Sequence, residues 1–275
     1  MRILVLGQGK MGKLVVQVAT ERGHDVCGLD VPENADAAAL TPEYLAGFDV
    51  AIDFTTPDAV VENMRACLGA GSKIVVGTTG WYAALPEMLK LAESTHAGLL
   101  HGTNYSIGVQ VMLKLAQQMG ASLAGVGYKF SIVETHHVTK LDKPSGTAIS
   151  IAEMVERGAG RKIEVPIESV REGDAKGTHV LEAVSEADRV VLTHEAFSRR
   201  GFADGAVRAA EWLATRSGCY DFRDVYTELA RIRSRLPQMH GFGLRWISNG
   251  DGRRCGPGWC RGGVGEAVCL PQRRS

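Results

Sequence analysis

The first hundred residues alternate between short apolar runs and segments whose apolar residues recur at helical spacing. The run at 3–6 ends in a glycine turn, and a helix-like segment follows it. The apolar residues of that segment are Met11, Leu14, Val15 and Val18. The same alternation predicts strands at 24–30, 49–54, 73–76 and 98–100, with helices that begin at Pro57 and near Pro86. Units of this length are typical of an α/β fold with a Rossmann-type, doubly wound parallel sheet.

After residue 105 the pattern changes, and strands no longer alternate regularly with helices. The spacing predicts helices at 109–119 and 147–157, and strands at 128–134 and 167–170. Two further strands, at 179–184 and 189–194, form a predicted hairpin across 185–188. A last helix is expected at 203–214. The middle of the chain therefore reads as a second, α+β unit with an antiparallel or mixed sheet.

Composition narrows the class of protein. The chain has 275 residues, 45% of them apolar and 23% charged, and a formal net charge of zero, so no global basic field favours nucleic acid or a membrane surface. Its apolar runs are far shorter than the roughly 20 residues that cross a bilayer, and we expect a cytoplasmic protein. The six cysteines include no C-x-x-C pair, which favours free thiols over a disulfide framework or a zinc knuckle.

A dinucleotide-binding motif lies between the first predicted strand and its helix. The glycines of G-x-G-x-x-G permit a tight turn and let helix N–H groups face a pyrophosphate. Its residues are Gly7, Gln8, Gly9, Lys10, Met11 and Gly12. Asp30 ends the second predicted strand, where a carboxylate normally accepts hydrogen bonds from the adenosine ribose, so NADH is favoured over NADPH. A nearby cation would offset that preference. The alternative for the glycine motif is a turn with a purely structural role, and the alternative for Asp30 is a solvated acid at the end of a strand.

Two more polar turns follow apolar strands and should lie at the carboxyl edge of the sheet, where ligands bind. The residues expected near the nicotinamide half of the cofactor are Gly77, Thr78 and Thr79 in one turn and Gly102, Thr103, Asn104 and Tyr105 in the other. Either turn, taken alone, is also compatible with an ordinary β–α connection, because Gly, Thr, Asn and Ser are common turn residues.

The segment 134–150, ETHHVTKLDKPSGTAIS, concentrates groups that favour an anion. His136 and His137 close an apolar strand, Lys140 and Lys143 follow, and Pro-Ser-Gly-Thr begins a helix whose N–H groups attract negative charge. Adjacent imidazoles chelate a metal awkwardly, and no third ligand stands at a familiar spacing, so we expect no metal. A histidine pair without a role is the other alternative. A hydride acceptor that carries carboxylates would be held here, with an imidazole or ammonium supplying the proton.

Seven sequence blocks together resemble one enzyme family over residues 1 to about 228. They are GQGKMG at 7–12, DFTTPDA at 53–59, GTTG at 77–80, NYSIGV at 104–109, the E-x-H-H…K-x-D-x-P-S-G-T-A block at 134–148, VREGDAKGTH at 170–179, and SRRGFADGAVRAAEWL at 198–213. With these blocks the chain resembles the 4-hydroxy-tetrahydrodipicolinate (dihydrodipicolinate) reductases of bacterial diaminopimelate and lysine biosynthesis, which reduce a cyclic imine dicarboxylate with NAD(P)H.

The resemblance implies roles for the histidine block. His136 would be the general acid/base and Lys140 the proton donor, while His137, Lys140, Gly146 and Thr147 would clamp the substrate carboxylates. It also implies a homotetramer paired through the second sheet. The implied division is a dinucleotide-binding domain at 1–105 plus 200–228, a substrate-binding and oligomerisation domain at 106–199, and an atypical tail at 229–275, whose glycine-rich, aperiodic composition predicts poor order.

Three departures from the family pattern are visible: Thr139, Lys143, and the tail itself. Three rival functions also stand. Another amino-acid pathway dehydrogenase would leave the adjacent histidines before Pro-Ser-Gly-Thr unexplained. A non-catalytic nucleotide sensor of the same fold is opposed by the presence of both His136 and Lys140. A metal-dependent enzyme would lose its activity to a chelator.

Overall fold

The computed structural model describes residues 1–31 and 33–229. The predicted tail at 229–275 lies outside the described residues except for Leu229, which ends the last helix.

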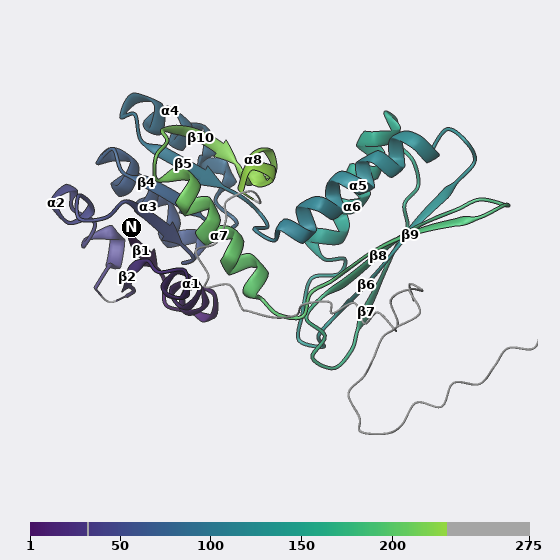
Figure 1. The fold of residues 1–275 in the computed structure, drawn as a ribbon, viewed down its shortest axis with the longest axis horizontal. Helices are drawn as coiled ribbons and strands as arrows, with labels where there is room; N and C mark the ends of the chain where they lie inside the picture. Colours follow the sequence, from purple (N-terminus) through teal and green to yellow (C-terminus); the bar gives the residue numbers. More distant parts are fainter. Residues whose placement is uncertain (32, 230–275) are drawn as a thin grey trace, which may run out of the picture. The chain divides into compact units, whose positions relative to one another are not determined.

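A six-stranded parallel sheet organises the first part of the chain, as the sequence predicts (Figure 1). The strand order is β10-β5-β4-β3-β1-β2, so the chain reverses its direction of travel across the sheet between β1 and β3. Ligands of open α/β sheets bind beyond the carboxyl ends of the strands at such a point. The strands are β1 (Arg2–Leu6), β2 (Asp25–Leu29), β3 (Val50–Asp53), β4 (Lys73–Val76), β5 (Gly98–His101) and β10 (Gly218–Asp221).

Helices cover both faces of this sheet because successive residues of a strand point to opposite sides. On β1, Ile3 and Val5 join a core with α1 and α7, whereas Leu4 and Leu6 join a second core with α3 and α4. Both faces are therefore buried, as expected for a parallel sheet. The helical segments of this region are α1 (Lys10–Glu21), η1 (Ala35–Ala37), α2 (Pro42–Leu45), α3 (Pro57–Gly69), η2 (Tyr82–Ala84), α4 (Leu85–Ser94), α7 (Arg200–Leu213) and α8 (Phe222–Leu229).

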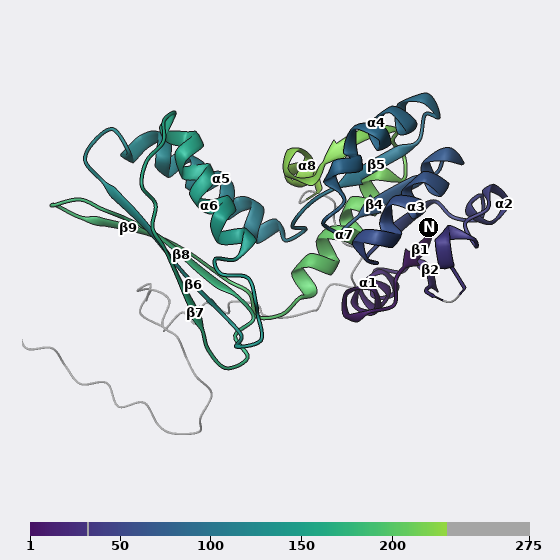
Figure 2. The same cartoon turned by 180° about the vertical axis from the view of Figure 1, so that it is seen from behind.

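The second sheet has four strands in the order β7-β6-β8-β9, and it is mixed. β6 pairs in parallel with β7 and antiparallel with β8, while β8 and β9 form the predicted hairpin, closed by a hydrogen bond from Ser185 N to Asp188 O at 3.0 Å. The strands are β6 (Lys129–His136), β7 (Ile167–Arg171), β8 (Thr178–Val184) and β9 (Arg189–Glu195). Figure 2 shows α5 (Ile107–Leu123) and α6 (Gly146–Ala159) together on one face of this sheet.

Helices α5 and α6 approach each other closely because glycines stand at their contact. A Cβ on Gly120 would lie 2.1 Å from the carbonyl oxygen of Val155, and one on Gly158 would lie 1.9 Å from that of Gln117. Such distances are far inside van der Waals contact, so only glycine fits at either place. This contact fixes the position of α6, whose N-terminus carries the Pro-Ser-Gly-Thr segment.

Across residues 1–31 and 33–229, the helices are all too short or too polar to span a bilayer.

Candidate functional site

The dinucleotide motif forms the turn between β1 and α1 that its sequence predicts. Gly7 has a φ of +85°, and a Cβ there would lie 2.4 Å from the carbonyl oxygen of Phe54. A Cβ on Gly12 would lie 1.8 Å from the carbonyl oxygen of Gly7. Gly9 is the N-cap of α1, and a Cβ there would meet nothing within 4 Å. The first and third glycines thus make the turn, and the second leaves its outer side open for a phosphate.

A buried carboxylate lies at the centre of a hydrogen-bond network that links the loops after β2, β3 and β4. Asp53, at the end of β3, accepts hydrogen bonds from Thr55 N (3.0 Å), Thr55 Oγ1 (2.8 Å), Thr78 Oγ1 (2.7 Å) and Asn63 Nδ2 (2.8 Å). Asn63 in turn accepts from Asn34 Nδ2 at 2.9 Å, in the loop after Asp30. The loops after β2, β3 and β4 at the carboxyl edge of the sheet are therefore connected through Asp53 together with Asn63.

Several residues predicted to meet the cofactor turn their side chains into the protein. Thr78 is buried against Asp53, and the hydroxyl of Tyr105 donates to Val76 O at 2.8 Å. Gly77 lies against the ring of Phe54, and a Cβ on Gly102 would come within 2.8 Å of Phe222. Any contact from these four positions to a cofactor is therefore made by the backbone. Asp30 directly follows β2 and is partly exposed.

The two adjacent histidines have different surroundings. His136, the last residue of β6, is 8% exposed and lies on the helix-covered side of the sheet. His137 is half-buried, and its Nδ1 lies 2.7 Å from Thr139 Oγ1. It lines a surface pocket together with Lys176 and Arg199. The two side chains therefore lie in different environments at the end of β6.

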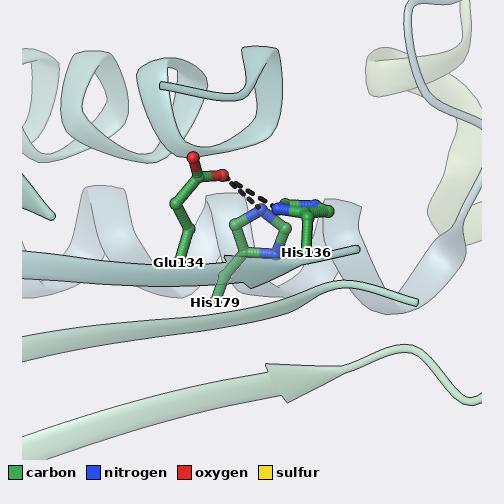
Figure 3. Close-up of side chains that lie close together, drawn as sticks. All are labelled: Glu134, His136 and His179. Atoms are coloured by element: carbon green, nitrogen blue, oxygen red, sulfur yellow. Dashed lines mark ion pairs between the residues drawn. The ribbon is translucent and has the colours of Figure 1, made fainter. Parts of the chain in front are cut away.

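His136 belongs to a cluster with Glu134 and His179 (Figure 3). Its Nδ1 lies 3.1 Å from Glu134 Oε2, a contact of ion-pair type that is not well aligned as a hydrogen bond. His179 Nε2 lies 3.9 Å from the same oxygen. The other carboxylate oxygen, Oε1, accepts from Ser169 Oγ (2.7 Å) and Arg171 Nη2 (3.0 Å). Nδ1 of His136 is thus directed at Glu134, and Nε2 is its other ring nitrogen.

Strand pairing explains why these residues meet. Glu134 pairs with Ser169 of β7 and with His179 of β8, and His179 pairs with His194 of β9. Partners in a β-sheet project to the same face, so a polar row crosses all four strands on the side of the sheet that α5 and α6 cover. His136 pairs with Arg171 one step further along.

Burial and hydrogen bonding set the protonation of this row. Burial opposes the charge of Glu134, but hydrogen bonds from Ser145, Ser169 and Arg171 prevail and hold its pKa at about 2. Burial lowers the pKa of His136, against the attraction of Glu134 and assisted by the positive charges of Lys140 and Arg171. Burial, with His136 nearby, lowers the pKa of His179 to about 4. An ionised carboxylate thus faces imidazoles that favour the neutral form.

The N-terminus of α6 is capped beside this cluster. Ser145 Oγ accepts from Ala148 N at 3.2 Å and lies 3.2 Å from His179 Nε2, while Ser145 N donates to Glu134 Oε1 at 3.0 Å. The amides of Gly146 and Thr147 open the helix, and a Cβ on Gly146 would meet nothing within 4 Å. An anion at this end gains from the helix dipole.

Two predicted site residues, Asn104 in the turn after β5 and Thr147 in the first turn of α6, lie in contact. Asn104 Nδ2 lies 3.5 Å from Thr147 Oγ1, so the polar turn after β5 meets the N-terminus of α6. Lys140 lies in the loop between β6 and α6, where its Nζ is 2.7 Å from Asp142 Oδ1.

Glu134, His136 and His179 also form a cluster that geometry alone would allow as a metal site, since their ligand atoms lie within 4.8 Å of one another. The carboxylate, however, already balances the guanidinium of Arg171 and accepts three hydrogen bonds on Oε1. A dication would meet the field of Arg171 and Lys140 at close range. These contacts and charges oppose a metal ion at this cluster.

Sequence reasoning assigned no role to Glu134, Ser169, Arg171 or His179. Glu134 and His136 stand two residues apart on a predicted strand, and this spacing places them on one face. That signal was available in the sequence. The contributions of Ser169, Arg171 and His179 come from strand pairing between distant segments, which a single sequence does not reveal.

Comparisons with known proteins agree with this arrangement. The chain matches the family model described as "Dihydrodipicolinate reductase, N-terminus" over residues 1–105 and the one described as "Dihydrodipicolinate reductase, C-terminus" over residues 108–226. It is 34% identical to the 4-hydroxy-tetrahydrodipicolinate reductase of Christiangramia forsetii over 242 residues, which cover 83% of this chain and 99% of that protein. The corresponding protein of Acinetobacter baumannii is 34% identical over 266 residues, with 82% and 95% covered.

Solved structures give the same result. The dipicolinate-bound dihydrodipicolinate reductase from Paenisporosarcina sp. TG-14 matches with a TM-score of 0.69 at 25% identity, covering 82% of this chain and 99% of that one. An amine dehydrogenase from Mycobacterium smegmatis matches with a TM-score of 0.55 at 12% identity and 82% and 95% coverage, which shows a shared fold alone.

Proposed function

This chain belongs to the dihydrodipicolinate reductase family, and on that premise we propose which residues carry out its reaction. The family's enzymes are 4-hydroxy-tetrahydrodipicolinate reductases, NAD(P)H-dependent oxidoreductases that act on a dipicolinate-type substrate. When bound, the reduced nicotinamide supplies a hydride to the ring of a cyclic imine dicarboxylate, in the lysine (diaminopimelate) pathway. The side chains must then orient the ring, balance its two carboxylates and deliver one proton.

His136 and Lys140 are the residues that handle the proton. The observation that carries this proposal is the imidazole of His136, whose Nδ1 lies 3.1 Å from Glu134 Oε2, beside the N-terminus of α6. Because its pKa is lowered, His136 is neutral near pH 7 and its Nε2 accepts or relays a proton. Lys140, an ammonium in the adjacent loop, is the donor.

The carboxylates of the substrate are held by His137, Lys140, Gly146 and Thr147. The amides of Gly146 and Thr147 lie at the positive end of α6, where an anion is stabilised. Lys143 is exposed in the same loop and adds a further positive charge near this end.

Separate alanine substitutions of two nearby lysines, Lys140 and Lys143, test the proposed role of Lys140 as proton donor. Lys140→Ala should lower kcat by about 100-fold or more, the range of general acid catalysis, with NADH affinity nearly unchanged. Lys143→Ala is the matched control, and it should retain kcat and change at most the KM for substrate. The readout is oxidation of reduced cofactor with freshly generated substrate. A similar effect of both substitutions would move the proton to another donor, and a wild type that binds cofactor without turnover would favour a nucleotide sensor.

The cofactor site is proposed at the carboxyl edge of the six-stranded sheet. Its residues are Gly7, Gln8, Gly9, Lys10, Met11, Gly12, Asp30, Gly77, Thr78, Thr79, Gly102, Thr103, Asn104 and Tyr105. NADH is the preferred cofactor, since a carboxylate at Asp30 accepts from ribose hydroxyls and repels a 2′-phosphate. Asp30→Ala should therefore narrow the ratio of kcat/KM for NADH over NADPH. An unchanged ratio would contradict this role.

We also propose a homotetramer assembled through the face of the four-stranded sheet opposite α5 and α6. Val133, Val184 and Val191 are exposed on the strands of this sheet, and alternation along β6 directs Val133 away from α5 and α6. Val133→Lys should reduce the molar mass measured by light scattering. The division into 1–105 plus 200–228 and 106–199, supported by the two separate sheets and cores, and a cytoplasmic location complete the proposal.

A further inference from the structure

A buried ion pair contacts His136, the loop that carries Lys140 and the N-cap of α6. Glu134 and Arg171 lie on neighbouring strands, with side chains 0% and 7% exposed, and Glu134 Oε1 is 3.0 Å from Arg171 Nη2. Buried pairs of this kind often contribute little net stability, because desolvation offsets their attraction.

Arg171 holds the loop that carries Lys140. Its Nη2 donates to Asp142 O at 2.5 Å, and its Nε donates to Lys140 O at 3.3 Å. Together with the bond to Glu134, these contacts use the planar fork of the guanidinium in three directions. A lysine, with one compact ammonium group, does not reproduce that geometry.

Glu134 holds the other two elements. Its Oε2 faces Nδ1 of His136, and its Oε1 accepts from the backbone N–H of Ser145, the residue that caps α6. The carboxylate therefore links the orientation of the imidazole with the position of the helix N-terminus.

We propose that the Glu134–Arg171 pair is a positioning unit for the reduction, which holds His136, the Lys140 loop and the N-terminus of α6 so that they converge on one dicarboxylate. Neither residue needs to touch the substrate. This inference rests on the proposed function, and it adds two residues whose effect is transmitted through the groups they hold.

Two conservative variants and one control test the inference. Glu134→Gln keeps the shape of the side chain but removes its charge and one acceptor. Arg171→Lys keeps the charge next to Glu134 but gives up the simultaneous contacts to Lys140 O and Asp142 O. Glu211→Gln is the control, because Glu211 on α7 forms a largely buried pair with Arg22, just after α1, at 2.6 Å. Each protein is assayed for kcat, for binding of dipicolinate and NADH by calorimetry, and for thermal unfolding.

Misplacement of reacting groups should lower kcat by about 10- to 100-fold and weaken dipicolinate by about 10-fold in both site variants, with NADH affinity within about twofold of wild type. Glu211→Gln should lower Tm and leave kcat and both affinities unchanged. If the pair has only a structural role, the two site variants should lower Tm as the control does and keep kcat and dipicolinate affinity. Alternatively, they should lose affinity for NADH and for dipicolinate together. Either result overturns the inference. If Glu134→Gln does not fold, Arg171→Lys alone decides.

The wild type separates this inference from the proposed function. If the wild type turns over substrate and binds dipicolinate, and the two site variants keep wild-type kcat and dipicolinate affinity, only the positioning role is rejected. A wild type that neither turns over substrate nor binds dipicolinate rejects the proposed function and this inference with it.

Discussion

Replacing Asp53 with asparagine should weaken cofactor binding although this buried side chain is not one of the proposed cofactor contacts. The carboxylate accepts four hydrogen bonds, three on Oδ1 and one on Oδ2. In Asp53→Asn the carbonyl oxygen takes the place of Oδ1, and the new NH2 group faces the NH2 group of Asn63 at the present distance of 2.8 Å. Two donors then oppose each other.

Asn63 is able to relieve this clash only by turning its amide over. That turn would break the bond it accepts from Asn34 Nδ2 at 2.9 Å, so Asn34 would have to turn as well. Among the described residues, Asn34 Oδ1 is a buried atom without a hydrogen-bond partner. The disturbance therefore passes from β3 to the loop that follows Asp30.

The size of the effect follows from the cost of a buried unsatisfied polar group, about 1 to 3 kcal/mol. If about 1 kcal/mol of this must be recovered when the cofactor orders the three loops, the Kd for NADH rises about fivefold. The assay is calorimetric titration with NADH, alongside thermal unfolding. Asp49→Asn is the control, since Asp49 stands just before the same strand and accepts from Arg2 N at 2.7 Å. A lowered Tm with an unchanged Kd would refute the coupling between Asp53 and the cofactor loops.

Two further predictions concern His136 and its surroundings. Gly177→Ala should lower kcat, because φ is +135° there and the added Cβ would lie 3.0 Å from His136 Nε2; Gly127→Ala, with φ +92° and open space around it, is the control, and equal losses in the two would contradict the prediction. The pKa of Glu134 is about 2 in the folded protein against an ordinary 4.5, so its stabilisation is complete above about pH 4.5 and is lost as the pH falls toward 2. Urea midpoints of Glu134→Gln should accordingly vary less over this range than those of wild type, and parallel curves would contradict the assignment.

The elements that the sequence predicted well are those with strong periodicity. Strands of the first sheet and helices such as α1 and α5 have apolar residues at regular spacing, and the hairpin of β8 and β9 is marked by polar turn residues. β10 and α8 were not predicted, because β10 has four residues, of which two are apolar, and gains its place by pairing with β5. Pairing between distant segments is a tertiary property, and local pattern does not encode it.

The candidate site was predictable to the same extent. The glycine turn, the histidine block and the helix N-terminus lie within short stretches of sequence, so their chemistry is visible in the order of residues. Arg171 and His179 are 37 and 45 positions beyond Glu134, and they reach it only because β7 and β8 flank β6. Similarly, Asp53 and Asn34 are joined through Asn63 on α3, and no sequence motif predicts this link.

The alternation along β6 has a consequence for engineering this protein. Glu134 and His136 face the helices while Val133 and Thr135 face the opposite side, so both surfaces depend on the same backbone. Inserting or deleting one residue upstream in β6 would let the strand slip and exchange its two surfaces, even if every backbone bond of the sheet re-formed. Outward-facing substitutions, by contrast, alter only the exposed side. Library design on this strand should therefore keep the strand length fixed and vary the odd positions with the proposed subunit interface in view.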